Sequence, residues 1–392
     1  MSTMNWERIL SKQVVELPKS GIREFFDLVT GSKDIISLGV GEPDFVTPWN
    51  IREAAITSLE KGRTTYTSNY GLESLRRAIA TYVEEFFKVS YNPLNEILPT
   101  VGVSEAIDLA LRCLVNPGDE VLYHEPAYVS YAPSVQLCYG HPKPVETSID
   151  DLFALNPAKL EAAITPRTKV LMLNFPTNPT GSIAPVQTLQ AIADICIKHD
   201  LFVLTDEIYS ELRYDGEEHT SIASLPGMKE RTLLLHGFSK AFAMTGFRLG
   251  YACGPKELID QMMKIHSYTM ICPTITSQEA GIEALQNGVP AMLEMRDSYH
   301  RRRDYIVGRF NAMGMDCHMP GGAFYTFPSV KRFGLSSKDF AMRLLQEAKV
   351  AAVPGTAFGA CGEGYLRCCY ATGMQQLVEA CDKMERFCAS LS

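Results

Sequence analysis

Long apolar segments are missing from this sequence of 392 residues. No run approaches the ~18 apolar residues that a membrane-spanning helix needs. The first residues, MSTMNWERILSKQ, lack the apolar stretch of a signal peptide, which predicts that the protein stays in the cytoplasm. No C-x-x-C pair occurs among the 11 cysteines, which are scattered from Cys113 to Cys388. This usage argues against a disulfide framework or a zinc site and fits a reducing compartment.

Basic charge is scarce as well. The 37 Lys and Arg residues are outnumbered by 45 Asp and Glu residues, and the formal net charge is −8. A nucleic-acid surface would show a basic stripe, so we expect no nucleic-acid partner. The 46% hydrophobic and 21% charged content is typical of a globular protein, and the length is sufficient for two domains.

Short apolar runs alternate with longer amphipathic stretches along most of the chain. Apolar residues recur three and four positions apart in 104–115 and 186–199, which predicts helices there. Strands that alternate with helices pair in parallel and form an α/β sheet covered on both faces. The buried strands that we expect are 120–123, 169–174, 202–205, 232–236 and 249–253.

The pattern changes after about residue 280. A long charged helix at 292–313 precedes a Gly-Gly turn and short strands at 324–327 and 351–353. We therefore expect an α/β fold with a mostly parallel sheet, plus a smaller α+β domain. The expected division is an N-terminal arm over 1–45 that contributes to the small domain, a large domain over 46–280, and the small domain over 281–392.

Lys240 closely follows an apolar strand, and Arg248 comes eight residues later. In α/β folds, ligands bind beyond the carboxyl ends of the strands, where this lysine would lie. Desolvation beside a cation lowers the pKa of an amine and makes it a nucleophile. The alternative is an exposed lysine at the end of a strand, and Lys240 alone does not decide between the two.

Polar residues follow three other apolar runs. Asp206 could bind a metal, accept a proton, pair with a buried cation or cap a helix. Asn178 lies in a loop with two prolines and a glycine, which either aims its amide at a ligand or serves only as structure. Gly102 and Ser104 open a helix whose N–H groups could hold a phosphate, and the alternative is an ordinary helix start without a ligand.

Together these motifs resemble the fold-type I, class I aminotransferases, the family of aspartate aminotransferase. The resemblance runs over nearly the whole chain. It is strongest to the bacterial subgroup that includes broad-range, aspartate, aromatic and N-acetyl-diaminopimelate aminotransferases. The matching stretches, in family order, are SLGVGEPDF (37–45), YTSNYGLESLR (66–76), NPTG (178–181), TDEIY (205–209), SKAFAMTGFRLGY (239–251) and YLRCCYAT (365–372).

The resemblance implies a cofactor and a reaction. The cofactor is pyridoxal 5′-phosphate, and an α-amino group moves between an L-amino acid and a 2-oxo acid, with 2-oxoglutarate as the expected acceptor. Lys240 would hold the cofactor as an imine and move a proton on the substrate. Asp206 would keep the pyridine nitrogen protonated. Tyr209 and Asn178 would donate to the phenolate oxygen, and the ring of Tyr128 would stack on the cofactor.

The phosphate end of the cofactor is also assigned by the resemblance. Arg248 would clamp the phosphate, and Val103 and Ser104 would donate at the helix start. Val103 stands where many relatives have a small residue, but its backbone can still donate. Gly237 stands where the animal aspartate enzymes have a phosphate-binding serine. Whether Ser239 supplies that hydroxyl stays open.

The substrate end involves two further positions. Arg367 matches the arginine that binds the substrate carboxylate, assisted by Asn178. Gly41 would let the backbone approach that carboxylate closely, because no Cβ intrudes. Tyr66 matches a tyrosine that reaches the phosphate in a neighbouring subunit. The resemblance therefore also implies a homodimer with shared active sites.

Three other functions are weighed against this one. A carbon–sulfur β-lyase would use the same lysine, cofactor and carboxylate clamp, and it is the alternative on this fold. A nicotinamide-dependent oxidoreductase lacks support, because no G-x-G-x-x-G follows the first strand. A ligand-sensing regulator of this fold would need an added DNA-binding domain, for which the chain has no spare length or basic segment.

The amino donor stays open. A second arginine in the pocket would favour aspartate or glutamate, and an apolar pocket would favour aromatic substrates. Arg23 in the N-terminal arm is one candidate for binding a side-chain carboxylate, although a solvated surface charge is the more common role for such a residue.

Overall fold

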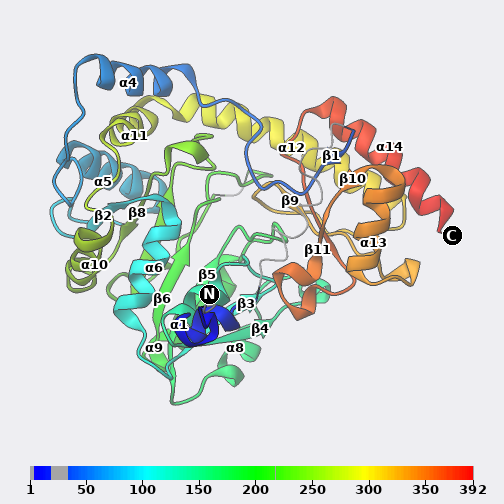
Figure 1. Ribbon diagram of the computed structural model, residues 1–392, viewed down its shortest axis with the longest axis horizontal. Helices are drawn as coiled ribbons and strands as arrows, with labels where there is room; N and C mark the ends of the chain where they lie inside the picture. Colours follow the sequence, from blue (N-terminus) through cyan, green and yellow to red (C-terminus); the bar gives the residue numbers. More distant parts are fainter. Residues whose placement is uncertain (1–3, 19–33, 217, 392) are drawn as a thin grey trace.

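The computed structural model describes residues 4–18, 34–216 and 218–391. Figure 1 shows a broad part on the left, built around one large sheet, and a smaller part on the right that ends in α14 (Met374–Ser390). The long helix α12 (Val289–Ala312) runs from the first part to the second. Within the described ranges, no helix is both long and apolar enough to pass through a bilayer.

In the described part of the chain, the large sheet has seven strands, and most of them are parallel. Across the sheet they are β2 (Ile97–Thr100), β8 (Gly250–Cys253), β7 (Thr232–Gly237), β6 (Phe202–Asp206), β5 (Thr168–Asn174), β3 (Glu120–Glu125) and β4 (His141–Glu146). All neighbouring pairs from β7 to β4 are parallel. Each strand predicted from apolar runs is present, with ends shifted by up to two residues.

The prediction of parallel pairing is wrong for β8, which is antiparallel to both β7 and β2. A parallel connection needs a crossover of a dozen or more residues, usually a helix. Between β7 and β8 the chain forms turns and the short 3₁₀ segment Thr245–Phe247 but no crossover helix, so it returns directly alongside β7. That return places the loop carrying Lys240 at the carboxyl end of β7.

Helices cover both faces of the sheet, as expected. Successive side chains of a strand point to opposite faces, so Val121 and Tyr123 pack with one set of helices and Leu122 with another. One face is covered by α6, α7 and α10, and the other by α8 and α9 together with α5 and α11. The helices of this part are α4 (Trp49–Glu60), α5 (Glu73–Phe87), α6 (Gly102–Leu114), α7 (Tyr131–Leu137), α8 (Pro157–Ala163), α9 (Val186–Lys198), α10 (Lys256–Thr269) and α11 (Ile275–Asn287).

Two small sheets lie beside α12, α13 (Ser337–Arg343) and α14 in the right-hand part of Figure 1. Strands β11 (Val353–Pro354), β12 (Leu366–Cys369) and β9 (Tyr325–Thr326) form an antiparallel sheet. Strand β1 (Ile36–Ser37) pairs in parallel with β10 (Val350–Ala351). The single strand predicted at 351–353 is therefore wrong, because its two ends pair in different sheets.

The N-terminal segment contacts both parts of the molecule. Strand β1 joins the C-terminal elements, whereas α1 (Trp6–Ile9) and α2 (Lys12–Glu16) lie on the large part. There, Gln13 donates a hydrogen bond to the backbone oxygen of Gln136 in α7. The domain boundaries at 45 and 280 stay a prediction.

Candidate active site

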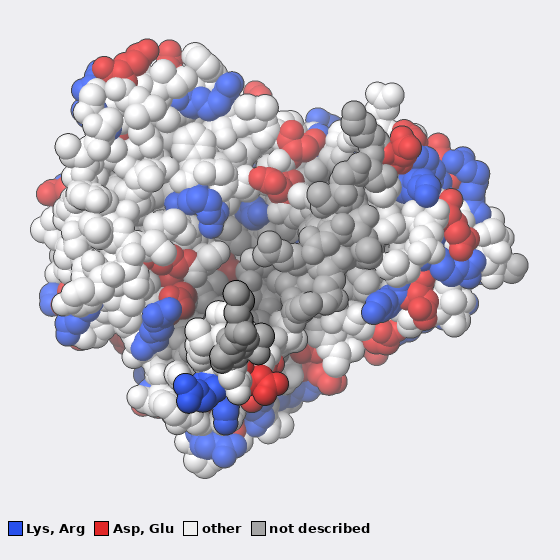
Figure 2. Space-filling view, in the orientation of Figure 1, with Lys and Arg blue, Asp and Glu red and all other residues white. Residues whose placement is uncertain are grey.

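A cavity of about 580 Å³ opens beyond the carboxyl ends of β5, β6 and β7. On the face shown in Figure 2, the molecule is hollowed between its two parts, and Lys and Arg side chains are mixed with Asp and Glu around the hollow. Eleven of the twelve residues predicted for the site line the cavity: Gly41, Val103, Ser104, Tyr128, Asn178, Asp206, Tyr209, Ser239, Lys240, Arg248 and Arg367. The exception, Tyr66, does not line it and is 79% exposed.

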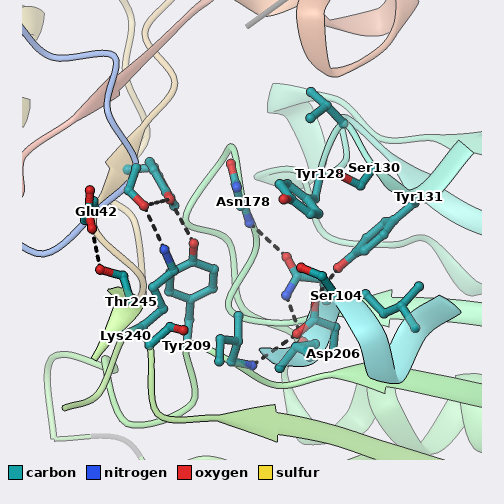
Figure 3. A pocket seen from close by; sticks show the side chains of 18 of the residues that line it. Glu42, Ser104, Tyr128, Ser130, Tyr131, Asn178, Asp206, Tyr209, Lys240 and Thr245 are labelled. Carbon is teal, nitrogen blue, oxygen red and sulfur yellow. Dashed lines mark hydrogen bonds between the residues drawn. The ribbon is translucent and has the colours of Figure 1, made fainter. Parts of the chain in front are cut away.

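Lys240 projects into this cavity from the loop after β7 (Figure 3). Its Nζ donates a hydrogen bond of 2.7 Å to the backbone oxygen of Gly41. Burial lowers the pKa of this amine from its usual value to about 8, because the charged form loses its hydration. Lys240 is thus a cavity residue, and the alternative of an exposed lysine at a strand end is wrong.

Asp206 ends β6 and is almost completely buried. Its Oδ2 accepts a hydrogen bond of 2.7 Å from the Tyr131 hydroxyl, and its Oδ1 accepts one of 3.3 Å from the N–H of Ile208 (Figure 3). Burial raises the pKa of Asp206 to about 6, although the bond from Tyr131 favours the charged form. Turns rather than a helix follow Asp206, so the helix-cap alternative is wrong.

Asn174, which the sequence reasoning did not single out, joins two of the predicted site residues. Its Nδ2 donates to the backbone oxygen of Asp206 at 2.8 Å, and its Oδ1 accepts from the N–H of Asn178 at 2.9 Å. Its own N–H donates to Nε2 of His124 at 3.1 Å, and burial lowers the pKa of that imidazole to about 4, so the ring stays neutral. The loop carrying Asn178 is thereby held against the end of β6.

Arg367 on β12 is 2% exposed and faces the cavity from the opposite side. One Nη donates to Oδ1 of Asn178 at 3.0 Å, and the other donates to the backbone oxygen of Gly39 at 2.5 Å. The guanidinium also lies 4.7 Å from the ring centres of Tyr325 and Phe358. Its buried Nε has no hydrogen-bond partner among the described residues, so one edge of the fork is available to a carboxylate.

Arg248 and the first turn of α6 converge at another end of the cavity. Gly102 opens α6 with φ +76°, and a Cβ there would lie 2.6 Å from an Nη of Arg248. A Cβ at Gly250 would lie 2.6 Å from the backbone nitrogen of Val103. Only glycine allows these approaches, which bring the guanidinium beside the free N–H groups of a helix start, a favourable site for an anion.

Gly237 has a structural reason to be glycine. A Cβ at this position would lie 3.0 Å from the Gly250 backbone and 3.3 Å from the Val103 side chain, so a serine would require its neighbours to shift. Ser239 lines the cavity two residues later. Its contact with a phosphate stays a prediction.

Tyr325 is a second residue that the sequence reasoning missed. Its hydroxyl is 2.8 Å from the hydroxyl of Tyr209, and a Cβ added to Gly41 would lie 2.4 Å from it. Gly41 is therefore required in this structure by the tyrosine packed against it. Tyr325 lies on β9, far along the chain from the other residues of the site, and no motif marks it in the sequence.

These groups fit pyridoxal 5′-phosphate. An arginine and a helix start suit its phosphate, a buried carboxylate suits a protonated pyridine nitrogen, and a lysine of lowered pKa suits its aldehyde. No ion pair or metal-ligating cluster involves Asp206 within the described residues, so its carboxylate is available to a cationic ligand. The fold and the cavity thus define an α/β enzyme with a site for a pyridoxal cofactor.

Comparison with known proteins identifies the family. The model described as "Aminotransferase class I and II" matches residues 33–384. The chain is 53% identical over 378 residues to a Bacillus subtilis protein named "Putative aminotransferase YugH". The match covers 96% of this chain and 98% of that protein. It is 46% identical to the aspartate aminotransferase of Pyrococcus abyssi, covering 94% and 95% of the two chains.

A solved structure gives the same result. The aromatic aminotransferase from Pyrococcus horikoshii OT3 superposes with a TM-score of 0.90 at 44% identity, over 94% of this chain and 99% of that one. The chain belongs to the class I and II aminotransferases, is a transaminase, and uses pyridoxal 5′-phosphate. The β-lyase alternative is not favoured by these relatives. Arg23, the candidate for binding a side-chain carboxylate, lies outside the described residues.

Proposed function

We propose that this cavity moves the α-amino group of an L-amino acid to a 2-oxo acid, with 2-oxoglutarate as acceptor and Lys240 as the proton-transferring base. The observation that carries the proposal is the placement of Lys240, Asp206 and Arg367 on one cavity. Arg367 offers a free guanidinium edge for the α-carboxylate of the substrate. A substrate bound there would lie in the same cavity as Lys240.

Each protein group then has a defined task. When bound, pyridoxal phosphate withdraws electrons from the substrate α-carbon. Asp206 would keep the ring nitrogen protonated, and Tyr209 and Asn178 would donate to the phenolate oxygen. Lys240 takes the proton from the α-carbon, for which its lowered pKa is suited because a neutral amine is present near pH 8.

The same proposal assigns the remaining contacts. Arg248 and the backbone N–H groups of Val103 and Ser104 would hold the phosphate, and Ser239 would add a hydroxyl; all four residues line the cavity. The ring of Tyr128, which lines the cavity, would stack on the cofactor. The ring of Tyr131, which also lines the cavity, packs edge-to-face with the ring of Tyr128, and the two ring centres are 5.6 Å apart.

We also propose a cytoplasmic homodimer. The position of Tyr66 supports this: its ring is 79% exposed and lies outside the cavity of its own chain, as expected of a residue that serves the phosphate of a second subunit. The free thiols of all 11 cysteines support a reducing compartment. The division into an arm, a large domain and a small domain at 45 and 280 is part of the same proposal.

A panel of amino donors against 2-oxoglutarate tests the proposal. The panel includes both aspartate and aromatic amino acids, because the relatives are named for these two classes of donor. We expect glutamate formation, and a Lys240→Ala variant should lose at least about a thousandfold in kcat, since proton transfer and covalent binding of the cofactor both depend on the amine. Parent-rate transamination by Lys240→Ala, or pyruvate release from cystathionine without glutamate formation, would contradict the proposal.

A further inference from the structure

Tyr131 lies in the wall of the active-site cavity, yet none of the family motifs contains it. It is the first residue of α7 and is 1% exposed. Its hydroxyl donates to Oδ2 of Asp206 at 2.7 Å, a length typical of a hydrogen bond from O–H to a carboxylate (Figure 3). Burial and the negative charge of Asp206 raise the pKa of Tyr131 well above its usual value, so the phenol keeps its proton and acts as the donor.

We propose that Tyr131 is a positioning residue that acts on the cofactor through Asp206. Its hydroxyl keeps the Asp206 carboxylate ionised and holds one oxygen, so that the other oxygen is directed at the pyridine nitrogen. This inference rests on the proposed role of Asp206 and adds the group that controls its charge. Because a buried carboxylate tends to bind a proton, a donor to its charged form is what this position requires.

The charged and titratable groups around Asp206 leave this task mainly to Tyr131. The hydrogen bond from Tyr131 is the largest influence that lowers the pKa of Asp206, followed by the backbone N–H of Ile208. His236 on β7 acts in the same direction through its charge, but it is engaged by the buried carboxylate of Glu211 at 3.0 Å. Glu207, the next residue along the chain, opposes them by raising the pKa of Asp206.

The first experiment uses the apoenzyme, so that its readout does not depend on activity. Asp206 binds a proton more tightly in the folded protein, at a pKa of about 6, than in the unfolded chain, at about 3.9. Its contribution to stability is therefore lost as the pH rises from about 4 through about 6. In Tyr131→Phe the pKa of Asp206 in the folded protein rises further. The decrease of the urea midpoint with pH should therefore extend to a pH about one unit higher than in the parent protein.

The second experiment measures the affinity for pyridoxal phosphate at pH 8. Tyr131→Phe should bind the cofactor about tenfold more weakly, as expected for loss of one hydrogen bond to a charged group. With the cofactor bound, kcat should fall while the KM for the amino donor changes little, because Arg367 is untouched. The matched control is Tyr91→Phe, which removes a hydroxyl that is also buried and has no hydrogen-bond partner in the described part of the chain.

A double-mutant cycle shows whether Tyr131 acts through Asp206. If it does, Tyr131→Phe should weaken cofactor binding in the parent protein but not in an Asp206→Asn background. Equal losses in the two backgrounds, or an unchanged pH profile of the apoenzyme, would overturn the inference while the proposed function stands. If Asp206→Asn itself leaves cofactor binding and transamination intact, the proposed role of Asp206 is wrong as well.

Discussion

Burial shifts the pKa values of two residues in this site, Lys240 and Asp206. It lowers the pKa of Lys240 and raises that of Asp206, so each group is displaced toward its neutral form. A neutral amine is the form that attacks an aldehyde or takes a proton, whereas a carboxylate must be charged to hold a protonated ring nitrogen. Lys240 is therefore suited to its task by burial alone, and Asp206 needs hydrogen-bond donors to counteract burial.

The lowered pKa of Lys240 predicts a pH dependence of apoenzyme stability. In the unfolded chain the amine titrates near 10.4, and in the folded protein at about 8, so the unfolded state binds more protons between these values. Stability relative to a Lys240→Met variant should therefore rise as the pH increases from about 8 to 10.4, by at most about 3 kcal/mol. Urea unfolding of the two apoproteins at several pH values measures this, and parallel profiles would exclude a buried, neutral Lys240.

Arg367 should determine carboxylate binding. Arg367→Ala removes a bidentate donor and leaves the buried oxygens of Asn178 and Gly39 unpaired, so kcat/KM for any amino donor should fall by about a hundredfold or more. The visible absorbance of the bound cofactor should persist. Arg343→Ala, which breaks an exposed ion pair with Glu347, is the control and should keep the parent rate. If kcat/KM fell equally for amino donors with and without an α-carboxylate, this role of Arg367 would be contradicted.

At the scale of elements, the start of α6 and the loop after β7 together form the proposed phosphate site. Neither makes it alone: α6 presents its N–H groups, and the antiparallel return of β8 brings Arg248 next to them. Glycines at 102 and 250 permit the close approach of the two segments.

Gly102→Ala should therefore weaken phosphate binding. The added Cβ would lie 2.6 Å from the guanidinium of Arg248 and would sit on a backbone with φ +76°. We expect the dissociation constant for pyridoxal phosphate to rise at least about tenfold, together with a loss of about 1 kcal/mol in stability. Gly118→Ala is the matched control, because its φ is +93° but nothing lies within 4 Å of the added Cβ. Equal effects of the two variants on cofactor binding would show that strain alone is responsible.

At the scale of the molecule, the site is assembled from the large sheet and the three-stranded sheet. Lys240 and Asp206 follow strands of the large sheet, and Arg367 and Tyr325 lie on strands of the three-stranded sheet. Exposed apolar side chains also gather outside the cavity. Trp49, Ile56 and Leu59 are spaced by seven and three residues, so they share one face of α4.

This face of α4 is where we expect the second subunit to bind. The parent protein should sediment at twice the chain mass of 43.5 kDa, and Trp49→Asp combined with Ile56→Asp should reduce it to the mass of one chain. Cofactor affinity should fall at the same time, because Tyr66 of each subunit would leave the other's phosphate. Leu152→Asp, at another exposed apolar position, is the control. A parent protein that sediments as a single chain at micromolar concentration would contradict the homodimer.

By itself, the sequence was sufficient for the fold class and the family, and all but one of the site residues that it predicted line the cavity. Strand runs, turn residues and the motifs around Lys240, Asp206 and Arg367 are local features, and local features can be read from a linear chain. The predicted strands of the large sheet differ from the observed ones only by a residue or two at their ends, whereas the strand predicted at 351–353 is divided between two sheets. The amino donor stayed open, since a side-chain pocket is not encoded in one contiguous motif.

Only the tertiary structure decided which residues support those of the motifs. Tyr131, Asn174 and Tyr325 act through contacts that join distant segments, and no spacing in the chain marks them. The antiparallel direction of β8 also depended on how the chain returned over the sheet. The physical reason is the same in each case: burial, hydrogen-bond partners and pKa values belong to the neighbours in space, which a lysine or an aspartate acquires only when the chain is folded.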